Sequence, residues 1–389
     1  MYQGPAVWSY GFRPFFLSAA IFAGTAIPVW ALLLNGIEGL PLRYQLREWH
    51  VHEMIFGFLP CVVTGFFLTA IPNWTDRLPM RGWPLMWLWS LWLAGRLSFA
   101  FPWVPPLLVA LIDGAFLIVI AGIVWREILA AQAWDRLPMG VLMSLYAIAN
   151  LLFHGLFLNR AETDLAERLG LTLIMILLAM IGGKITPSFT GDYLEALKVT
   201  KQPAPFSWFD GLSILLVAVA GVLWVLHAHS IVTGVAFVTA GSLNLMRVSR
   251  WYGWLTWREP LVLILHVGYG WLAIAFLMLG GALLGIGVYR EEAIHVLTTG
   301  AVGVMTLAVM TRASLGHTGR MKHAGVLTVL IYILVNVGAL LRIVGPSLTP
   351  SGDGMLVIAA GCWSGAYLLF VVGYGPLLLS RDVKEVSGQ

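Results

Sequence analysis

Long apolar runs follow one another along almost the whole chain, and only short polar segments separate them. An α-helix needs roughly 20 mostly apolar residues to cross a bilayer. The runs are continuous and do not alternate with polar residues, which excludes a membrane β-barrel. We therefore predict an all-α, polytopic integral membrane protein with about twelve transmembrane helices. The predicted spans are Phe15–Leu34, His50–Ile71, Trp83–Phe101, Val104–Trp125, Met139–Leu158, Leu169–Thr186, Phe209–Leu226, Ile231–Val248, Leu261–Gly285, Glu292–Thr311, Ala324–Ile343 and Met355–Leu379.

The longest connection lies between the sixth and seventh spans, at residues 187–208, and contains PSFTGDYLEALKVTKQPAP. It divides the chain into two six-helix halves, roughly residues 1–186 and 209–389. The halves show no convincing sequence repeat. We predict a single transmembrane domain, residues 1–389, with this connection on the cytoplasmic side.

The composition agrees with a membrane protein. The chain is 59% hydrophobic and 11% charged, with a mean hydropathy of +0.85, whereas soluble domains carry roughly 25% charged residues. The 18 tryptophans suit membrane interfaces. The pI of 9.1 does not indicate nucleic acid, because the basic residues are scattered between apolar runs. The two cysteines have no C-x-x-C partner, which argues against a disulfide framework, a zinc ribbon or covalently attached haem.

The distribution of lysine and arginine predicts the orientation. If the N-terminus is cytoplasmic, sixteen of these residues lie on the cytoplasmic side, six lie on the opposite side, and Arg96 lies within a span. Cytoplasmic loops carry the excess of positive charge in membrane proteins. Both termini are therefore expected in the cytoplasm. The first apolar run lacks a cleavage pattern and is expected to remain as a helix.

Six of the nine histidines lie in or beside the predicted spans, in two groups at opposite membrane faces. Ionisable residues inside a membrane are costly and are functional candidates. The outer group is His50, His52, His154 and His295, and the inner group is His266 and His317. His295 and His317 are separated by about 33 Å if the tenth span stays helical, so one haem cannot use both. The remaining three, His227, His229 and His323, are expected to be solvated in loops.

The segment REWHVHEMIFGFLP places His50 and His52 at the start of the second span. Residues two apart on a regular helix point about 200° away from each other, so the pair cannot bind one metal from such a helix. Either the pair precedes the helix, or the two imidazoles serve different centres. Glu53 is three residues from His50 and is placed to orient its imidazole. A capped, polar helix start is the alternative.

Haem suits histidines on separate membrane helices, because axial imidazoles hold the iron while the ring fills the apolar space between helices. Copper also takes imidazole ligands. Zinc with carboxylate ligands stays an alternative, although the H-E-x-x-H motif is absent. Arg96 and Asp113, on consecutive spans, are expected to form a buried ion pair, with a purely structural role as the alternative.

Four motifs together resemble the NnrS family, which comprises polytopic bacterial membrane proteins that bind haem and copper and are linked to nitric oxide stress and denitrification. The motifs are GFRPFF at residues 11–16, WHVHEMIFGF at 49–58, GGKITPSFT at 182–190 and MTRASLGHTGR at 310–320. The resemblance extends from the first span through the tenth. Lys184 stands where an arginine is expected, which keeps a cation but loses a bidentate fork.

The resemblance implies non-covalently held haem b, one or two per chain, and leaves open whether copper is also native. His50, His52 and His317 match family motifs, whereas His154, His266 and His295 are candidates from the topology alone. Arg13 and Arg320 also match motifs and, with Lys184, are expected to pair with haem propionates. Arg13 has a second interpretation as a positive-inside anchor beside the first span.

The implied function is action on nitric oxide in the bacterial cytoplasmic membrane, either by binding it or by reducing it with electrons from a quinol. An enzyme of this kind would be an oxidoreductase resembling nitric oxide reductases. Glu48 and Glu53 are candidates for a proton relay. The alternative is a twelve-helix secondary transporter, in which Arg96, Asp113 and Lys184 would be substrate or proton sites.

Overall fold

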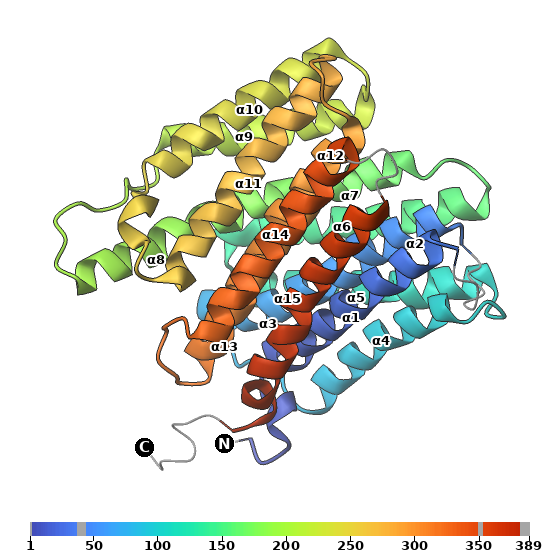
Figure 1. Ribbon diagram of the computed structural model, residues 1–389. Coiled ribbons are helices and arrows are strands. Elements are labelled where there is room, and N and C mark those ends of the chain that lie inside the picture. The colour runs from blue at the N-terminus through green and yellow to red at the C-terminus, as the bar shows by residue number, and fades with distance from the viewer. Residues whose placement is uncertain (1, 37–43, 349–352, 382–389) are drawn as a thin grey trace. The chain divides into compact units, whose positions relative to one another are not determined.

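The computed structural model describes residues 2–36, 44–348 and 353–381, and nothing is described of the side chains of residues 346–348 and 353. These residues form helices and connecting segments, and no strand occurs among them (Figure 1). The α-helices are α1 Phe12–Leu34, α2 Leu46–His52, α3 Leu59–Thr75, α4 Trp83–Ala100, α5 Pro106–Ala131, α6 Leu137–Leu158, α7 Asp164–Leu177, α8 Gly183–Ala196, α9 Trp208–Leu226, α10 Ile231–Ser249, α11 Pro260–Leu283, α12 Arg290–His295, α13 Gly303–His317, α14 Val326–Leu348 and α15 Asp353–Leu379.

Each predicted span overlaps with one helical stretch. Within the described residues, eleven of these stretches are long and apolar enough to cross a membrane. The twelfth, α4, has the length of a span but is less apolar, because it contains four tryptophans and Arg96. The predicted fold class is thus confirmed, and the chain is a multi-pass membrane protein.

Three of the twelve stretches contain a π-helical segment, in which the wider turn disturbs the regular backbone ladder. The second stretch joins α2 to α3 through η2, Glu53–Phe58; the sixth joins α7 to α8 through η4, Leu178–Gly182; the tenth joins α12 to α13 through η6, Val296–Val302. The π segments therefore recur at every fourth stretch.

Side chains from neighbouring helices bond to the main-chain carbonyls of these π segments. Tyr146 of α6 donates its hydroxyl to the carbonyl of Ile55, and the indole of Trp92 in α4 donates to that of Gly57 at 2.9 Å. In η4, Arg247 of α10 donates to the carbonyl of Ala179 at 2.9 Å. Side chains of neighbouring helices thus donate hydrogen bonds to carbonyl groups that water does not reach in a bilayer.

The boundary expected after the sixth span was wrong, because α8 continues through Pro187 to Ala196. Proline has no N–H, so the carbonyl four residues earlier, that of Gly183, loses its helical partner. The guanidinium of Arg247 donates to this carbonyl at 3.4 Å. Pro187 would end a helix by itself, but a hydrogen bond from Arg247, which is distant in the sequence, compensates for the lost helical bond.

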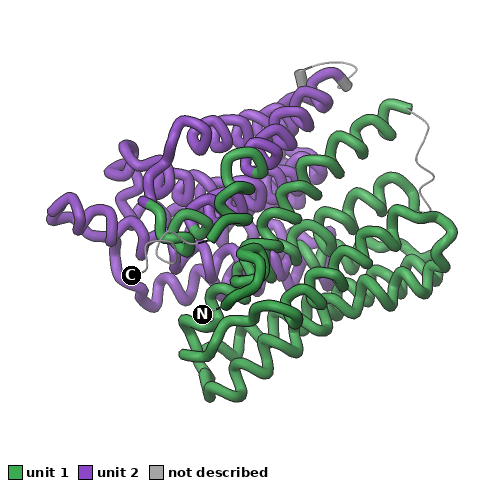
Figure 2. The backbone as a smooth tube through the Cα atoms, turned by 90° about the horizontal axis from the view of Figure 1, so that it is seen from below, with its two compact units in different colours: residues 1–171, 313–320, 371–389 green, residues 172–312, 321–370 purple. Residues whose placement is uncertain are grey.

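The packing divides the chain into two compact units (Figure 2). Unit 1 comprises residues 1–171, 313–320 and 371–389, and unit 2 comprises residues 172–312 and 321–370. In unit 1, α1 packs on α3, and α5 packs on both α4 and α6. In unit 2, α10 packs on both α9 and α11. The single domain with two six-helix halves stays a prediction.

The predicted orientation leads to a direct test. A reporter enzyme fused after Gln389 should be active in the cytoplasm, and one inserted at the exposed Glu162 should be active outside it. Alkaline phosphatase and green fluorescent protein fusions measure the two locations. Gln389 lies outside the described residues, as do Arg43 and Lys384, two of the counted cations. The reverse pattern of reporter activity would contradict the orientation.

Candidate metal centre

Six buried polar side chains meet inside unit 1. They come from the second helical stretch, α4, α5 and α6, and each is less than 10% exposed. We call this group the histidine–carboxylate cluster; its members are His52, Glu53, Arg96, Asp113, Asn150 and His154. So many ionisable groups within membrane-spanning helices mark this cluster as a functional candidate.

The local structure of the second stretch places two members of the cluster. His52 is the last residue of α2, and Glu53 is the first residue of the π segment η2. Four residues further on, Gly57 provides the space that the guanidinium of Arg96 occupies. A Cβ atom at this position would lie 2.1 Å from Nη1 of Arg96. The glycine is therefore required for the approach of the arginine.

Asp113 is the centre of the hydrogen-bond network. Its Oδ1 pairs with Nη2 of Arg96. Its Oδ2 accepts from Nδ2 of Asn150 at 2.8 Å and faces Nε2 of His154 at 3.0 Å. Nε2 of His52 lies 3.3 Å from the same oxygen. The predicted ion pair between Arg96 and Asp113 is thus confirmed, and it is shared with both histidines.

Both ring nitrogens of His52 face oxygen atoms. Nδ1 lies 3.2 Å from Oε1 of Glu53, and Nε2 lies 3.0 Å from Oδ1 of Asn150. Oε1 of Glu53 also accepts from Nη1 of Arg96 at 2.5 Å. An imidazole that donates at both nitrogens is positively charged. A protonated His52 together with Arg96 balances the charge of the two carboxylates, so the cluster is neutral without a metal.

Aromatic rings surround the two histidines. Phe99 stacks on His52 with ring centroids 4.2 Å apart, and Phe153 and Phe56 lie at 4.9 Å and 5.5 Å from the same imidazole. These rings exclude water and lower the local dielectric. Electrostatic interactions within the cluster are therefore stronger than they would be at a surface.

The cluster offers a donor set for a metal ion. One ligand atom each from His52, Asp113 and His154 lie within 4.8 Å of one another. Two imidazoles and one carboxylate are a set that binds iron, copper or zinc. Nδ1 of His154 is buried and has no hydrogen-bond partner within the described structure. Such an orphaned ring nitrogen is costly in a purely structural role.

The same geometry does not fit a haem held between His52 and His154. Their ring centroids are 4.9 Å apart, and Oδ2 of Asp113 faces both Nε2 atoms. A porphyrin between two axial imidazoles would have to take the place of this carboxylate. The cluster therefore fits a single metal ion better than a haem with both histidines as axial ligands.

His50 does not join the cluster. Its ring stacks on Trp30 of α1, with centroids 4.3 Å apart. Of the two alternatives for His50 and His52, the one in which both precede the helix is excluded, because α2 begins at Leu46. The two imidazoles lie in different surroundings. The expectation that Glu53 orients His50 was wrong, because its carboxylate bonds to His52 and Arg96.

His266 of α11 forms a second candidate site, in unit 2. Its Nε2 lies 2.7 Å from Oγ1 of Thr190, and that hydroxyl donates to the carbonyl of Thr186 at 2.8 Å. Thr190 therefore accepts from Nε2–H, which leaves the lone pair on Nδ1. Nδ1 is buried and without a partner among the described residues. Metal-binding histidines commonly donate their other N–H in this way, and the role of His266 stays a prediction.

The remaining candidates lie in separate surroundings. Nδ1 of His295 lies 2.6 Å from the carbonyl of Glu291, and the exposed His317 places its ring 5.6 Å from that of Phe12. The stretch from Arg290 to His317 is continuously helical. This is the condition on which the predicted separation of His295 and His317 rests. Lys184 is exposed, whereas Arg320 and Glu48 are half-buried. Their roles stay predictions.

Arg13 is fully buried in unit 1 and bonds to the end of α15. Its Nη1 donates to the carbonyls of Leu378 at 2.8 Å and Ser380 at 2.6 Å. A guanidinium at a helix C-terminus satisfies carbonyls that have no helical partner and stabilises the negative end of the helix dipole. Pairing with a haem propionate would require these bonds to be exchanged, and that role stays a prediction.

A second buried ion pair lies in unit 2 and contains no histidine. Nε of Arg247 donates to Oδ1 of Asp210 at 2.9 Å, and its Nη1 donates to the hydroxyl of Tyr269 at 2.6 Å. That hydroxyl donates to Oδ1 of Asn244 at 2.7 Å. With η4 also bound by Arg247, this network has a clear structural role.

The sequence comparison covers nearly the whole chain. A family model described as NnrS protein matches residues 6–381. No curated protein sequence matches this chain.

Proposed function

Because this chain belongs to the NnrS family, we propose that it is a metal- and haem-containing protein of the bacterial cytoplasmic membrane that acts on nitric oxide. The observation that carries the proposal is the buried donor set of His52, Asp113 and His154. An apolar gas concentrates in lipid and reaches a metal inside membrane helices without a shaped substrate pocket. Family membership supports nitric oxide as the partner.

In this proposal, His52, Asp113 and His154 hold a copper or iron ion. Glu53 accepts from Nδ1 of His52 and fixes its tautomer, and Asn150 orients the carboxylate of Asp113. Metal binding requires His52 to lose a proton, because only a neutral imidazole is a ligand. Metal uptake therefore releases a proton and weakens as the pH falls.

Haem b would be held elsewhere in the chain in this proposal. His266, with its tautomer set by Thr190, is the best supported residue to hold it. His50, His295 and His317 are further candidates at the ends of their helices. A haem iron supplies binding of nitric oxide and one-electron transfer.

Reversible binding of nitric oxide, which keeps the gas from other metals, is the simplest form of this function. Reduction would consume two molecules of nitric oxide, two electrons and two protons, and would yield nitrous oxide and water. A membrane quinol would supply the electrons. In this form of the proposal Glu53 and Glu48 relay the protons, which is supported by the position of Glu53 within the cluster and of Glu48 one helical turn before His52.

A secondary transporter is the less well supported function. A substrate or proton site there would need charged groups that water can reach. Arg96 and Asp113 are only 7% and 3% exposed, and they are bonded to each other and to their neighbours.

The proposal is tested on protein purified from cells supplied with haem precursor, iron and copper. We expect b-type haem by pyridine haemochrome analysis, a transition metal by elemental analysis, and a spectral change on anaerobic titration with nitric oxide. A variant with both His52 and His154 changed to alanine should lack the non-haem metal but keep the haem spectrum. Wild-type protein with neither haem nor metal would refute the proposal.

A further inference from the structure

A pocket of about 310 Å³ lies in unit 1, where α3 and α5 end and α4 begins. It has an apolar floor, to which Leu68 and Ile71 of α3 and Ile123 of α5 contribute. The two α3 residues are buried and Ile123 is partly exposed. No part of this pocket belongs to the histidine–carboxylate cluster, which lies at the other ends of the same helices.

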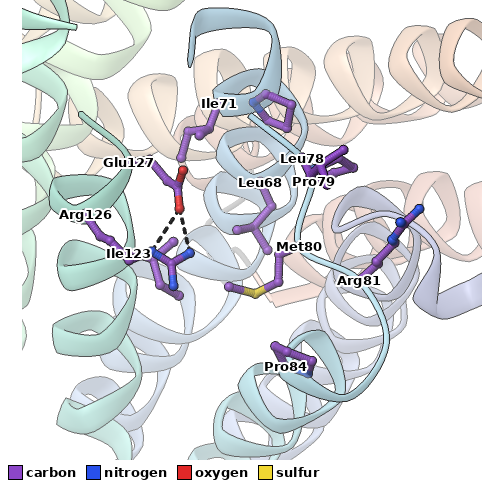
Figure 3. Close-up of a pocket in the computed structure, with 11 residues that line it drawn as sticks. Leu68, Ile71, Leu78, Pro79, Met80, Arg81, Pro84, Ile123, Arg126 and Glu127 are labelled. Atoms are coloured by element: carbon purple, nitrogen blue, oxygen red, sulfur yellow. Dashed lines mark hydrogen bonds and ion pairs between the residues drawn. The ribbon is translucent and has the colours of Figure 1, made fainter. Parts of the chain in front are cut away.

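Charged groups stand on two sides of this floor. Glu127, which is only 7% exposed, accepts from Nη2 of Arg126 at 2.6 Å and from Nε of Arg77 at 2.5 Å. Arg81 lies on the opposite side, across Leu68 and Met80 (Figure 3). Arg81 is exposed, and its guanidinium has no bonding partner within the described chain.

The charges around the pocket favour an anion. Arg77 and Arg126 pair with Glu127, and Arg81 lines the opposite side of the pocket, so three guanidinium groups are near a single lining carboxylate. These four groups together carry two excess positive charges. Asp76, which follows α3 next to Arg77, reduces this excess to one positive charge. The carboxylate holds two of the guanidinium groups in place, and the third is attached to a long side chain that is able to turn toward the pocket. One excess charge matches a singly charged phosphodiester.

The surroundings of the pocket favour a lipid over a free anion. Leu78, Trp83 and Trp87 close to the pocket are 83%, 70% and 70% exposed. Exposed tryptophans next to arginines are typical of the membrane interface. The predicted orientation places these arginines on the cytoplasmic side, where the leaflet carries anionic lipids. An acyl chain has apolar surface to follow from the pocket into the bilayer.

From these observations we propose that the pocket binds the headgroup of an anionic phospholipid of the cytoplasmic leaflet. The phosphodiester lies between Arg81 and Arg126, and the first acyl carbons lie on Leu68, Ile71 and Ile123. A zwitterionic lipid binds more weakly, because its ammonium group meets the same arginines. Each arginine near the phosphate contributes roughly a five-fold gain in affinity.

The test uses full-length, cofactor-loaded protein that has been delipidated in a neutral detergent. Brominated phosphatidylglycerol and brominated phosphatidylcholine are titrated separately, and quenching of tryptophan fluorescence near the pocket reports binding. We expect at least ten-fold tighter binding of phosphatidylglycerol. The double change Arg81→Gln and Arg126→Gln should remove most of this preference, whereas Arg258→Gln, an exposed arginine stacked on Trp257, should leave it unchanged.

Two further measurements keep the outcome clear. Ile123→Trp fills the pocket without changing its charge and should also weaken binding of phosphatidylglycerol. Millimolar inorganic phosphate should not compete; competition would show a free-anion site and would overturn the lipid assignment. Equal binding of the two lipids by the wild type would overturn it as well. The metal and haem contents should not change in any of these variants, so failure here is distinguishable from failure of the proposed function.

Discussion

Replacement of Arg96 by leucine is expected to lower the free energy of unfolding by about 3–5 kcal/mol. The guanidinium bonds to both Glu53 and Asp113, which are only 1% and 3% exposed. Its loss leaves two carboxylates in a water-excluded site with one imidazolium to balance them. The cost of an uncompensated buried charge, and not the strength of the lost contacts, determines this effect.

Equilibrium unfolding in mixed micelles with increasing dodecyl sulfate measures the change. Arg47→Leu is the matched control, because Arg47 also pairs with two carboxylates, those of Glu167 and Asp164, but its side chain is 55% exposed. That variant should lose about 1 kcal/mol or less. The double variant Arg96→Leu with Glu53→Gln should recover part of the loss, because one carboxylate is neutralised. Equal stability of Arg96→Leu and Arg47→Leu would contradict this account.

The sequence predicts the fold well because the bilayer imposes a simple rule. In the bilayer core no water is present to bond to the backbone N–H and C=O groups of an apolar run of about twenty residues. These groups must therefore bond to each other, and an α-helix achieves this within the run itself. The run from His50 to Ile71 therefore identifies its helix without knowledge of any partner. The helix begins earlier than the apolar run, at Leu46, because the polar residues before the run also form helical main-chain hydrogen bonds.

Where a helix departs from this rule, the cause is a hydrogen bond to a residue distant in the sequence, which the local sequence pattern does not reveal. Pro187 is a helix-ending signal by itself, yet α8 passes through it because Arg247, sixty residues later, bonds to the carbonyl of Gly183. The π segment at Glu53–Phe58 is similarly supported by Tyr146 and Trp92. Such contacts become visible only once the helices are packed.

The candidate site was predicted in part. His52, from its motif, and His154, from its span, were named as metal-binding candidates, and the pair of Arg96 and Asp113 was expected, but the histidines were not connected with the ion pair. Asn150 was not recognised as a link between them. A usable signal was present: with the predicted orientation, all of these residues lie in the outer halves of spans two to five. Depth within the membrane, in addition to residue type, would have grouped them.

The presence of histidine distinguishes the candidate metal centre from a structural ion pair in this chain. Asp210 and Arg247 also form a buried pair, and every contact described for Arg247 holds helices or a π segment together. The cluster around Asp113 differs in its two imidazoles and in Nδ1 of His154, which has no partner among the described residues. Asp210→Asn therefore serves as a control for general destabilisation without loss of metal.

Changing His52, His154 or Asp113 individually, to alanine or, for the aspartate, to asparagine, is expected to reduce non-haem metal by more than ten-fold. Each change removes one of three donors that lie within 4.8 Å of one another. Glu53→Gln should weaken metal binding by about 10–100-fold without removing a donor, because Glu53 orients the imidazole of His52.

His50→Ala is the sharpest control for these variants, because it lies two residues from His52 on the same helix and stacks on Trp30 instead. Elemental analysis of folded, monodisperse protein measures the metal, and the haem spectrum of each variant shows that the remaining structure is intact. Metal should also be lost progressively as the pH falls, since His52 must give up a proton to bind it. Loss of metal from His50→Ala, with retention in His52→Ala, would place the centre on the other side of the helix and remove the cluster from the proposed function.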